Sequence, residues 1–424
     1  MRAVIAAQKE IQSPVVAATQ RLDSLDAFRG LVILTMVFVN YLAGVHGIPS
    51  WAKHAKQGVD AFTFVDVVFP GFLFIVGVAI PFALHKRLQR GESKTGLIGK
   101  IFTRSAVLIF FGVITVNKGN FSPDATGMSR ELWFLLALVC MIVLWGGFPG
   151  ENLPKRKKFF LALRIAAGLL LIYLLAIFRG KSADGQIAWL QTSWWGILGM
   201  IGWAYLECAL IYLLFRGNST ALMGALLFMI ALFIGDKHGA LDWLGPVHNW
   251  INIGGVFGST AADVMIGILV GNCFVGSPAL APHLHRARFI LIFGVALLAA
   301  GFVLRPLHGI NKIDATESYA LVTGGICALC FLFVYFVMDV CEKKSWAKFL
   351  IPVGQNALLA YLLPGILANF FTAILAQFTP VLRADNFLYV LNEGWVGTIN
   401  CAVLTALILT LTAGLTKRQF VLKL

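Results

Sequence analysis

Charged residues are scarce in this sequence. Only 13% of its 424 residues are Asp, Glu, Lys or Arg, whereas 59% are hydrophobic. A typical soluble domain carries about 25% charged residues, so the composition excludes an ordinary water-soluble fold. Polar stretches are few and short, and no soluble domain is expected to interrupt the chain. We therefore predict a protein embedded in the lipid bilayer.

The hydrophobic residues gather in runs that approach the roughly 20 residues needed to cross a bilayer as a helix. The runs lack the apolar and polar alternation of a membrane β-strand, so helices must satisfy the backbone hydrogen bonds in lipid. The sequence therefore predicts an all-α fold, a polytopic bundle of about twelve transmembrane helices. Examples of the runs are Leu31–Leu42, Phe64–Leu84, Phe159–Phe178, Ile197–Phe215, Phe289–Leu304 and Ala320–Val340.

The formal net charge of +14 is unevenly distributed along the chain. Most Lys and Arg residues fall in alternate loops, with dense groups in Lys86–Arg104, Lys155–Arg164 and Lys343–Lys348. This asymmetry is typical of the positive-inside rule, and it predicts an even number of spans with both termini in the cytoplasm. Residues 1–24 then form a cytoplasmic segment without the features of a signal peptide, followed by one transmembrane domain over residues 25–424. Topology explains the charge, so no nucleic acid partner is expected.

Cysteine is also uncommon, with seven residues that all lie in or at the end of apolar runs. Cys327 and Cys330 form a CxxC motif, but no second pair accompanies it and it falls within a hydrophobic helix. Zinc sites and redox motifs need a different context. We interpret the cysteines as packing residues and predict no metal site.

Acidic side chains within the apolar runs need an explanation, because an ionisable group inside lipid must find a protein partner or a watery cavity. Asp66, Glu207 and Asp263 lie inside runs, whereas Asp339 lies where a helix should end. Pro70 follows Asp66 by four residues and cannot donate a hydrogen bond to its carbonyl, so we expect the helix to kink there. A kink beside a carboxylate suits a binding cavity, and a kink capped by water is the alternative.

Three polar residues of the first helical hairpin are candidates for a shared site. Asn40 lies 14 residues beyond Asp26, which places it about 21 Å along the first helix, near the outer boundary of the membrane. His54 follows in the loop, and Asp66 opens the second helix. An imidazole can accept a proton, a carboxylate can orient it and an amide can stabilise an oxyanion. A solvated loop histidine is the alternative for His54, and His46 is a rival in the same loop.

The residues of this hairpin resemble the heparan-α-glucosaminide N-acetyltransferase family. Members share an SLDxxRG start, an FVNY end of the first helix, a loop histidine and a second helix similar to DLVFPWFxFIMG. Weaker similarity continues through most of the chain. The matching segments here are Ser24–Gly30, Phe38–Tyr41, His54–Ala55, Asp66–Pro70, Phe74–Gly77, Trp195–Leu198, Gly255–Ser259, Asn311–Lys312, Ser318–Tyr319, Asp339–Val340 and Gly354–Asn356.

The resemblance implies that the protein moves an acetyl or other acyl group from cytosolic acetyl-CoA to an amino sugar or glycan on the opposite side of the membrane. His54 would be the catalytic base or an acyl-carrying nucleophile. Asn40 would bind the thioester carbonyl, and Asp66 would orient His54 or the acceptor. Asp26 and Arg29 form either a structural pair or part of the CoA entrance. Residues at further motif positions would line the pocket: Lys312, Ser318 and Asn356.

The chain also departs from the family pattern. Two spans around Leu132–Trp145 and Phe159–Phe178 are inserted, and Gly199-Met200 replaces a Gln-Arg pair. Asn252–Gly255 replaces an acidic DPEG motif, which places acceptor recognition in question. A bacterial inner-membrane relative fits the sequence better than a lysosomal enzyme, and a homodimer is compatible with it.

Two other classes of protein share these features. A transporter or flippase would also need kinked helices and buried acids such as Asp66, Glu207 and Asp263, but it would not need His54. A catalytically inactive relative would keep the fold as a membrane scaffold. Acyl-CoA turnover separates the acyltransferase from both.

Overall fold

The computed structural model describes residues 22–151, 153–182, 184–275, 282–372 and 392–422. Almost all of the regular structure in these ranges is helical, which confirms the all-α prediction. The predicted cytoplasmic segment 1–24 lies almost wholly outside the described residues. The described strands form two antiparallel pairs: β1 (Gly146–Gly147) with β4 (Val421–Leu422), and β2 (Gly180–Lys181) with β3 (Ile187–Ala188).

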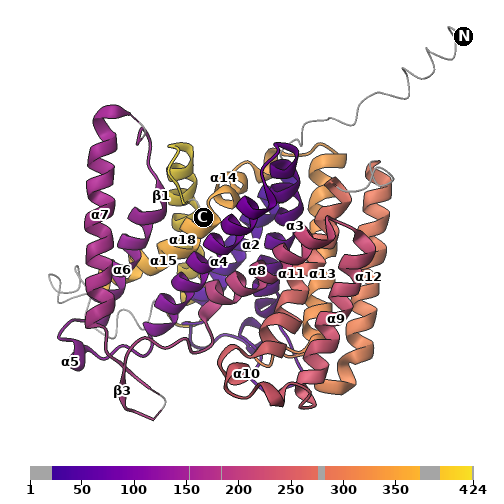
Figure 1. Cartoon of the computed structure of the whole chain (residues 1–424), viewed down its shortest axis with the longest axis horizontal. Helices are drawn as coiled ribbons and strands as arrows, with labels where there is room; N and C mark the ends of the chain where they lie inside the picture. The colour runs from indigo at the N-terminus through magenta and orange to yellow at the C-terminus, as the bar shows by residue number, and fades with distance from the viewer. Residues whose placement is uncertain (1–21, 152, 183, 276–281, 373–391, 423–424) are drawn as a thin grey trace, which may run out of the picture.

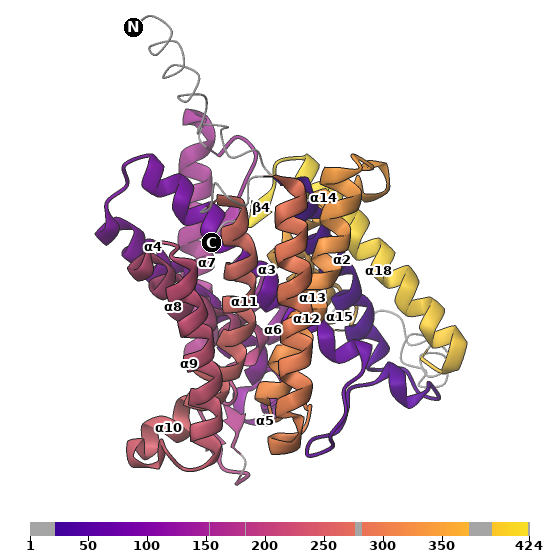
Figure 2. The same ribbon diagram turned by 90° about the vertical axis from the view of Figure 1, so that its right-hand side faces the viewer.

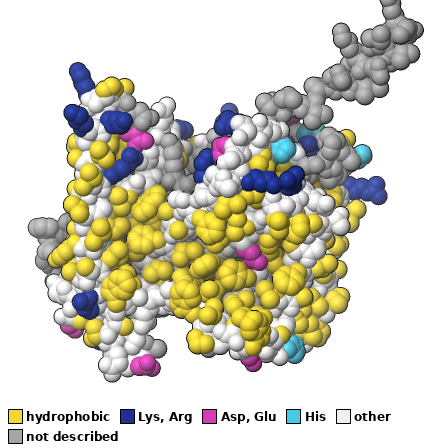
Figure 3. All heavy atoms as spheres, viewed as in Figure 1, with side chains coloured by type: hydrophobic (Ala, Val, Ile, Leu, Met, Phe, Trp, Pro, Cys, Tyr) yellow, Lys and Arg dark blue, Asp and Glu magenta, His cyan; other side chains and the backbone are white. Residues whose placement is uncertain are grey.

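Ten described helical segments are long and apolar enough to cross a bilayer, so the chain is an integral membrane protein. The helices stand roughly side by side (Figure 1), and the face seen in Figure 3 has a broad hydrophobic band between two more polar ends. The spanning helices are α2 (Asp23–Leu42), α3 (Val68–Gln89, after the 3₁₀ turn Phe64–Val67), α4 (Lys94–Asn117), α7 (Pro154–Ile177), α8 (Gly196–Phe215), α9 (Ser219–Lys237), α11 (Ala261–Val275, after the π-helix Gly254–Thr260), α12 (His283–His308), α13 (Glu317–Tyr335, continued by the π-helix Phe336–Val340) and α18 (Gly394–Lys417).

The sequence predicted about twelve spans, two more than the described residues provide. α6 (Arg130–Trp145) has 16 residues and α15 (Ala357–Phe370) has 14, fewer than the roughly 20 that cross the hydrocarbon core. The two predicted insertions correspond to α6 and α7, which lie at one edge of the bundle (Figure 1). Shorter helices complete the described chain: α5 (Pro123–Thr126), α10 (Pro246–Ile251) and α14 (Leu350–Gln355).

The span Gly254–Val275, which ends in α11, is the most buried of the ten: 94% of its apolar 18-residue stretch is buried inside the protein. It packs against α3 through glycines. A Cβ on Gly267 would strike the carbonyl of Phe74, and a Cβ on Gly77 would strike the carbonyl of Val264. Gly267 and Gly271 are four residues apart on the face of α11 that contacts the backbone of α3. Small residues at this spacing allow membrane helices to approach until their backbones touch.

The two ends of the bundle differ in chemistry. Most of the Lys and Arg side chains visible in Figure 3 lie at the top, the end where α2 begins, which is here called the basic end. At this end Lys344 Nζ lies 3.0 Å from Asp23 Oδ2. The opposite end, here called the His54 end, carries the α2–α3 loop (residues 43–63) and the α12–α13 loop (residues 309–316). Asp339 lies in the π-helix that ends at Val340, which confirms its predicted place at a helix end.

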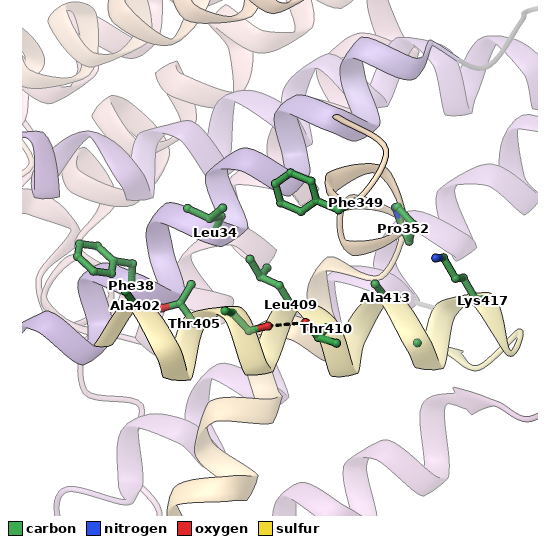
Figure 4. A pocket seen from close by; sticks show the side chains of 12 residues that line it. Leu34, Phe38, Phe349, Pro352, Ala402, Thr405, Leu409, Thr410, Ala413 and Lys417 are labelled. Atoms are coloured by element: carbon green, nitrogen blue, oxygen red, sulfur yellow. Dashed lines mark hydrogen bonds between the residues drawn. The ribbon is translucent and has the colours of Figure 1, made fainter. Parts of the chain in front are cut away.

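α18 crosses the outside of the bundle obliquely (Figure 2) and leaves a groove against α2. Leu34 and Phe38 of α2 face Leu409 of α18 across this groove (Figure 4). The hydroxyls of Thr405 and Thr410 bond back to carbonyls of their own helix and leave the groove apolar. Lys417, at the end of α18, also lines the groove.

Candidate active site

A histidine and a carboxylate meet at the His54 end. His54 Nδ1 lies 2.6 Å from Asp66 Oδ1, and the imidazole is 38% exposed while the carboxylate is fully buried. The other carboxylate oxygen accepts hydrogen bonds from the backbone N–H of Ala55 (3.2 Å) and of Thr63 (2.9 Å). A buried carboxylate with this many donors is fixed in place. It can therefore hold Nδ1 of His54 and fix the orientation of the imidazole ring.

The local sequence explains why Asp66 points into the loop. Thr63 and Asp66 form a capping box at the start of the 3₁₀ turn Phe64–Val67, which leads into α3. Pro70 then falls in the first turn of α3, where its missing N–H would have no helical partner in any case. Pro70 thus lies just after the change from a 3₁₀ turn to an α-helix and not in the interior of a continuous α-helix, and the carboxylate of Asp66 caps the 3₁₀ turn.

Lys312 joins this pair from the α12–α13 loop. Its Nζ lies 3.2 Å from Nδ1 and 3.4 Å from Nε2 of His54. Burial lowers the pKa of Lys312 although the carboxylate of Asp66 acts in the opposite direction. The site therefore places a cation, an imidazole and a carboxylate in contact.

Asn311 fastens the two loops together. Its amide nitrogen donates to the carbonyls of Lys56 (2.8 Å) and Val59 (2.7 Å) in the α2–α3 loop. Its amide oxygen accepts from the backbone N–H groups of Ile313 (2.8 Å) and Asp314 (3.1 Å) in its own loop. Asn311 is 2% exposed and uses both ends of its amide. This residue places its neighbour Lys312 over His54.

Asp60 makes a second fastening between the same loops. Its carboxylate accepts from the backbone N–H of Ile310 (2.8 Å) and from Nε of Arg305 (2.9 Å). The hydrogen bond from Ile310 has the largest effect in lowering the pKa of Asp60, and that from Arg305 lowers it further. Gly309, with φ of 70°, adjoins this contact, and a Cβ there would lie 3.1 Å from Cβ of Asp60. Residues about 250 positions apart thus share one rigid edge of the site.

The structure places the remaining residues of the first hairpin apart from this cluster. Asn40 is exposed in the last turn of α2, and within the described residues it has no hydrogen bond to His54 or Asp66. The predicted convergence therefore holds for two of the three residues. His46 lies in the segment that joins α18, where its backbone bonds to Asn392 and Gly394 (2.8 Å each). His46 and His54 belong to the same α2–α3 loop, but His46 pairs with the start of α18 whereas His54 pairs with Asp66.

Two of the predicted pocket residues have other surroundings. Ser318 is fully buried on α13, and its hydroxyl has no hydrogen-bond partner in the described part of the chain. The amide of Asn356 bonds to Thr416, Phe420 and Leu422 at the basic end. These contacts attach the end of the described chain to the start of α15, beside the cavity lined by Gln355, Ala357 and Leu422, and the pocket role of Asn356 stays a prediction.

A cavity of 380 Å³ opens near the basic end between α2, α3, α4 and α8. Arg29 and Arg104 line it, and it extends along α3 as far as Phe72. Phe72 is six residues beyond Asp66, a rise of about 9 Å along the helix. Arg29 also bonds to Asp26 Oδ1 and to the carbonyl of Gly354 (3.3 Å each). Arg29 thus forms a hydrogen-bonded pair with Asp26 and lines a cavity, and a part of this pair in a CoA entrance stays a prediction.

Arg104 is a cavity residue that the sequence did not single out. It lies in a basic stretch that topology explains sufficiently, and only the fold shows that its guanidinium turns inward over the ring of Tyr205 (4.7 Å). Within residues 22–422, less the undescribed gaps, no group of three or more His, Cys, Asp or Glu side chains is arranged to hold a metal ion.

Comparisons with known proteins agree with the resemblance seen in the first hairpin. Human heparan-alpha-glucosaminide N-acetyltransferase is 27% identical over 383 residues, which cover 84% of this chain and 54% of the human protein. The mouse protein of the same name is 45% identical over 101 residues, 24% of this chain and 15% of the mouse protein. The chain thus spans about half the length of the human protein, of which it is a distant homologue. Residues 21–274 match the family model described as Domain of unknown function (DUF5009), and the chain belongs to that family.

Proposed function

We propose that this protein is a membrane-bound acyltransferase that moves an acetyl group from acetyl-CoA to an amino sugar or glycan across the membrane. The observation that carries the proposal is the His54–Asp66 pair with Lys312 beside it, in a distant homologue of an N-acetyltransferase. The charge asymmetry favours the basic end as the cytoplasmic side and, with it, the cytoplasmic membrane of a bacterium as the location. The donor then enters at the basic end, and the acceptor binds at the His54 end.

The chemistry assigned to His54 follows from its hydrogen bonds. With Nδ1 donating to Asp66, the lone pair lies on Nε2, which faces Lys312 Nζ at 3.4 Å. When the acceptor takes the place of that contact, Nε2 accepts the proton of the acceptor amine or hydroxyl as that group attacks the thioester carbonyl. The C–S bond breaks, and the proton passes from His54 to the CoA thiolate. In the alternative route Nε2 attacks first and carries the acyl group. Both routes depend on the same nitrogen and on the same orientation by Asp66.

The cavity with Arg29 and Arg104 suits the donor. CoA carries several phosphate charges, and guanidinium groups bind phosphate through paired hydrogen bonds. The rest of the cavity is lined by apolar side chains such as Phe72 and Ile75 of α3, which suit an uncharged thioester arm. Two arginines at one end of an apolar cavity orient a ligand with one polyanionic end.

The test is acceptor-dependent release of free CoA from acetyl-CoA by the purified protein in detergent, with a panel of amino sugars and glycans. Reconstitution in vesicles with acetyl-CoA inside and acceptor outside, and the reverse, measures the sidedness. Release in only one arrangement supports transfer across the membrane. A lack of release with every donor and acceptor, together with vesicle uptake of a sugar, would replace the proposal by a transport function.

Arg104→Gln is expected to raise the KM for acetyl-CoA by about 10- to 100-fold, the effect of losing one charge-assisted hydrogen bond to phosphate. The turnover number should change much less, because Arg104 lines the cavity assigned to the donor and has no hydrogen bond to His54 in the described part of the chain. Steady-state kinetics with acetyl-CoA as the varied substrate measure both quantities. Arg288→Gln, a charge removal on the exposed start of α12, is the control. A lower turnover number with an unchanged KM would contradict the donor assignment.

Lys312→Met is expected to reduce transfer and to stabilise the protein. Burial lowers the pKa of Lys312 in the folded state, so its charged form opposes folding at neutral pH. That penalty is present below the folded pKa and disappears as pH rises towards the unfolded value of about 10.4. The Tm advantage of Lys312→Met should therefore be largest near pH 7 and shrink towards pH 10. Lys53→Met, an exposed change in the facing loop, should show no such trend.

A further inference from the structure

A second hollow at the basic end is unrelated to the cavity assigned to the donor. It encloses 330 Å³ where α3 ends, α4 begins and α8 ends. Each of the three helices contributes one basic side chain to its lining: His85, Lys94 and Arg216. The remaining lining residues are Leu88, Tyr212 and Leu213, so none of the side chains around it is acidic.

Arg216 reaches the hollow from an unusual backbone. Its φ of 50° and ψ of 39° lie in the left-handed region, which costs energy for any residue with a Cβ. Gly217 follows with φ of 74° and completes a tight turn into α9. Strained residues of this kind persist where the surrounding structure holds them, and they gather at functional sites.

A buried amide from the central helix holds this turn. Asn272 of α11 donates to the carbonyl of Gly217 (2.6 Å) and to the hydroxyl of Ser219 (3.0 Å). The hydroxyl of Tyr212, itself a lining residue, donates to the amide oxygen of Asn272 (3.3 Å). A Cβ on Gly217 would lie 3.0 Å from that oxygen. The core of the bundle thus fixes the position from which Arg216 extends.

The charges around the hollow are uncompensated. Lys94 is the first residue of α4, where the positive end of the helix dipole adds to its own charge. The nearest acidic residue in sequence, Glu92, pairs with Lys100 at 2.6 Å instead. Neither Lys94 nor Arg216 has an ion pair among the described residues. Positive charges gathered around one hollow favour the binding of an anion there.

We propose that this hollow binds a phosphate group at the membrane boundary, either the headgroup of an anionic phospholipid or a free phosphate compound. The positive-inside rule explains why basic residues occur in this loop. It does not explain why basic side chains from three helices line one hollow, or why Arg216 adopts a strained backbone. A guanidinium matches the geometry of phosphate oxygens, and basic pockets between membrane helices are suited to anionic headgroups. The proposal does not depend on acyl transfer.

The test uses the full chain in detergent and measures thermal unfolding and native mass spectra with three additions: phosphatidylglycerol, phosphatidylcholine and inorganic pyrophosphate. The double variant Lys94→Gln/Arg216→Asn removes two charges, and Asn tolerates the left-handed backbone. Arg288→Gln is the matched control on the same end of the bundle. We expect phosphatidylglycerol to bind and stabilise the native chain more than phosphatidylcholine does. Affinity should fall about fivefold for each charge removed, or about 25-fold in the double variant.

The outcomes separate the two sources of phosphate. Stabilisation by phosphatidylglycerol that the double variant loses and Arg288→Gln retains supports a lipid site. The same pattern with pyrophosphate supports a site for a soluble phosphate compound. If neither anion distinguishes the double variant from the native chain, the proposal is overturned. The single variant Lys94→Gln leaves the turn untouched and gives the same readout should the double variant fail to fold.

Discussion

His54→Gln is expected to abolish acceptor-dependent release of CoA, with a fall in the turnover number of about 10²- to 10⁴-fold. This is the range that a positioned general acid or base contributes. Gln keeps a polar side chain of similar reach but cannot accept a proton at neutral pH. Because the change lies in a loop on an exposed side chain, the fold and the affinity for acetyl-CoA should persist. Free thiol release measures the rate, and the KM for acetyl-CoA reports the donor site.

His46→Gln is the matched control for this prediction. It makes the same substitution eight residues earlier in the same loop, on an exposed side chain whose backbone joins α18. Its activity should equal that of the native chain. An equal loss in both variants would point to disturbance of the loop, and full activity of His54→Gln would remove His54 from the mechanism.

The two routes through His54 differ in what happens without an acceptor. An acyl-carrying histidine releases one equivalent of CoA in a burst, whereas a general base releases none. Asp66→Asn should lower the rate in either route, because an amide no longer fixes the tautomer and loses the charge that two backbone N–H groups solvate. Rapid-quench measurement of CoA and a mass shift of the protein decide between the routes.

Gly267→Leu is expected to prevent the bundle from assembling. A side chain on Gly267 would strike the carbonyl of Phe74 and the backbone of Val78, so α3 and α11 would have to separate. Overpacking of an interior costs about 1–3 kcal/mol when side chains can shift, and here the obstacle is backbone. We therefore expect a larger loss than that, seen as little monodisperse protein after extraction and a low Tm in what remains.

Gly224→Leu provides the control for this loss. Gly224 lies in α9, and a Cβ there would meet no other atom within 4 Å. The substitution improves helix propensity and adds an apolar side chain to a membrane helix, so the protein should stay folded. Size-exclusion profiles of both variants, purified alike, give the comparison. A well-folded Gly267→Leu protein would show that the close approach of α3 and α11 is not needed for stability.

Much of the candidate site followed from the first hairpin of the sequence. The pairing of His54 with Asp66 was predictable, because only eleven residues separate them and the resemblance fixed the order of the motifs. The structural role of Pro70 was not predictable, since a proline four residues after a polar group is compatible with either a kink or a helix start. The capping box of Thr63 and Asp66 decided for the start, and that motif was visible in the sequence. The hydrogen-bond partners of Asn356 could not be predicted, because a motif position says nothing about which groups of the folded chain will surround an amide.

The amino-acid sequence by itself determined that this protein lies in a membrane as a helical bundle, because the scarcity of charge and the length of the apolar runs leave a lipid-embedded backbone no other means of satisfying its hydrogen bonds. It also determined the basic character of one end. Only the tertiary structure decided which distant residues meet: Lys312 with His54, Arg104 with Arg29 around the 380 Å³ cavity, and Arg216 with Lys94 around the second hollow. The physical reason is that glycines and buried amides determine which helix faces can come into contact. A hydrophobic run that is apolar on every side does not indicate which of its faces packs against a neighbouring helix.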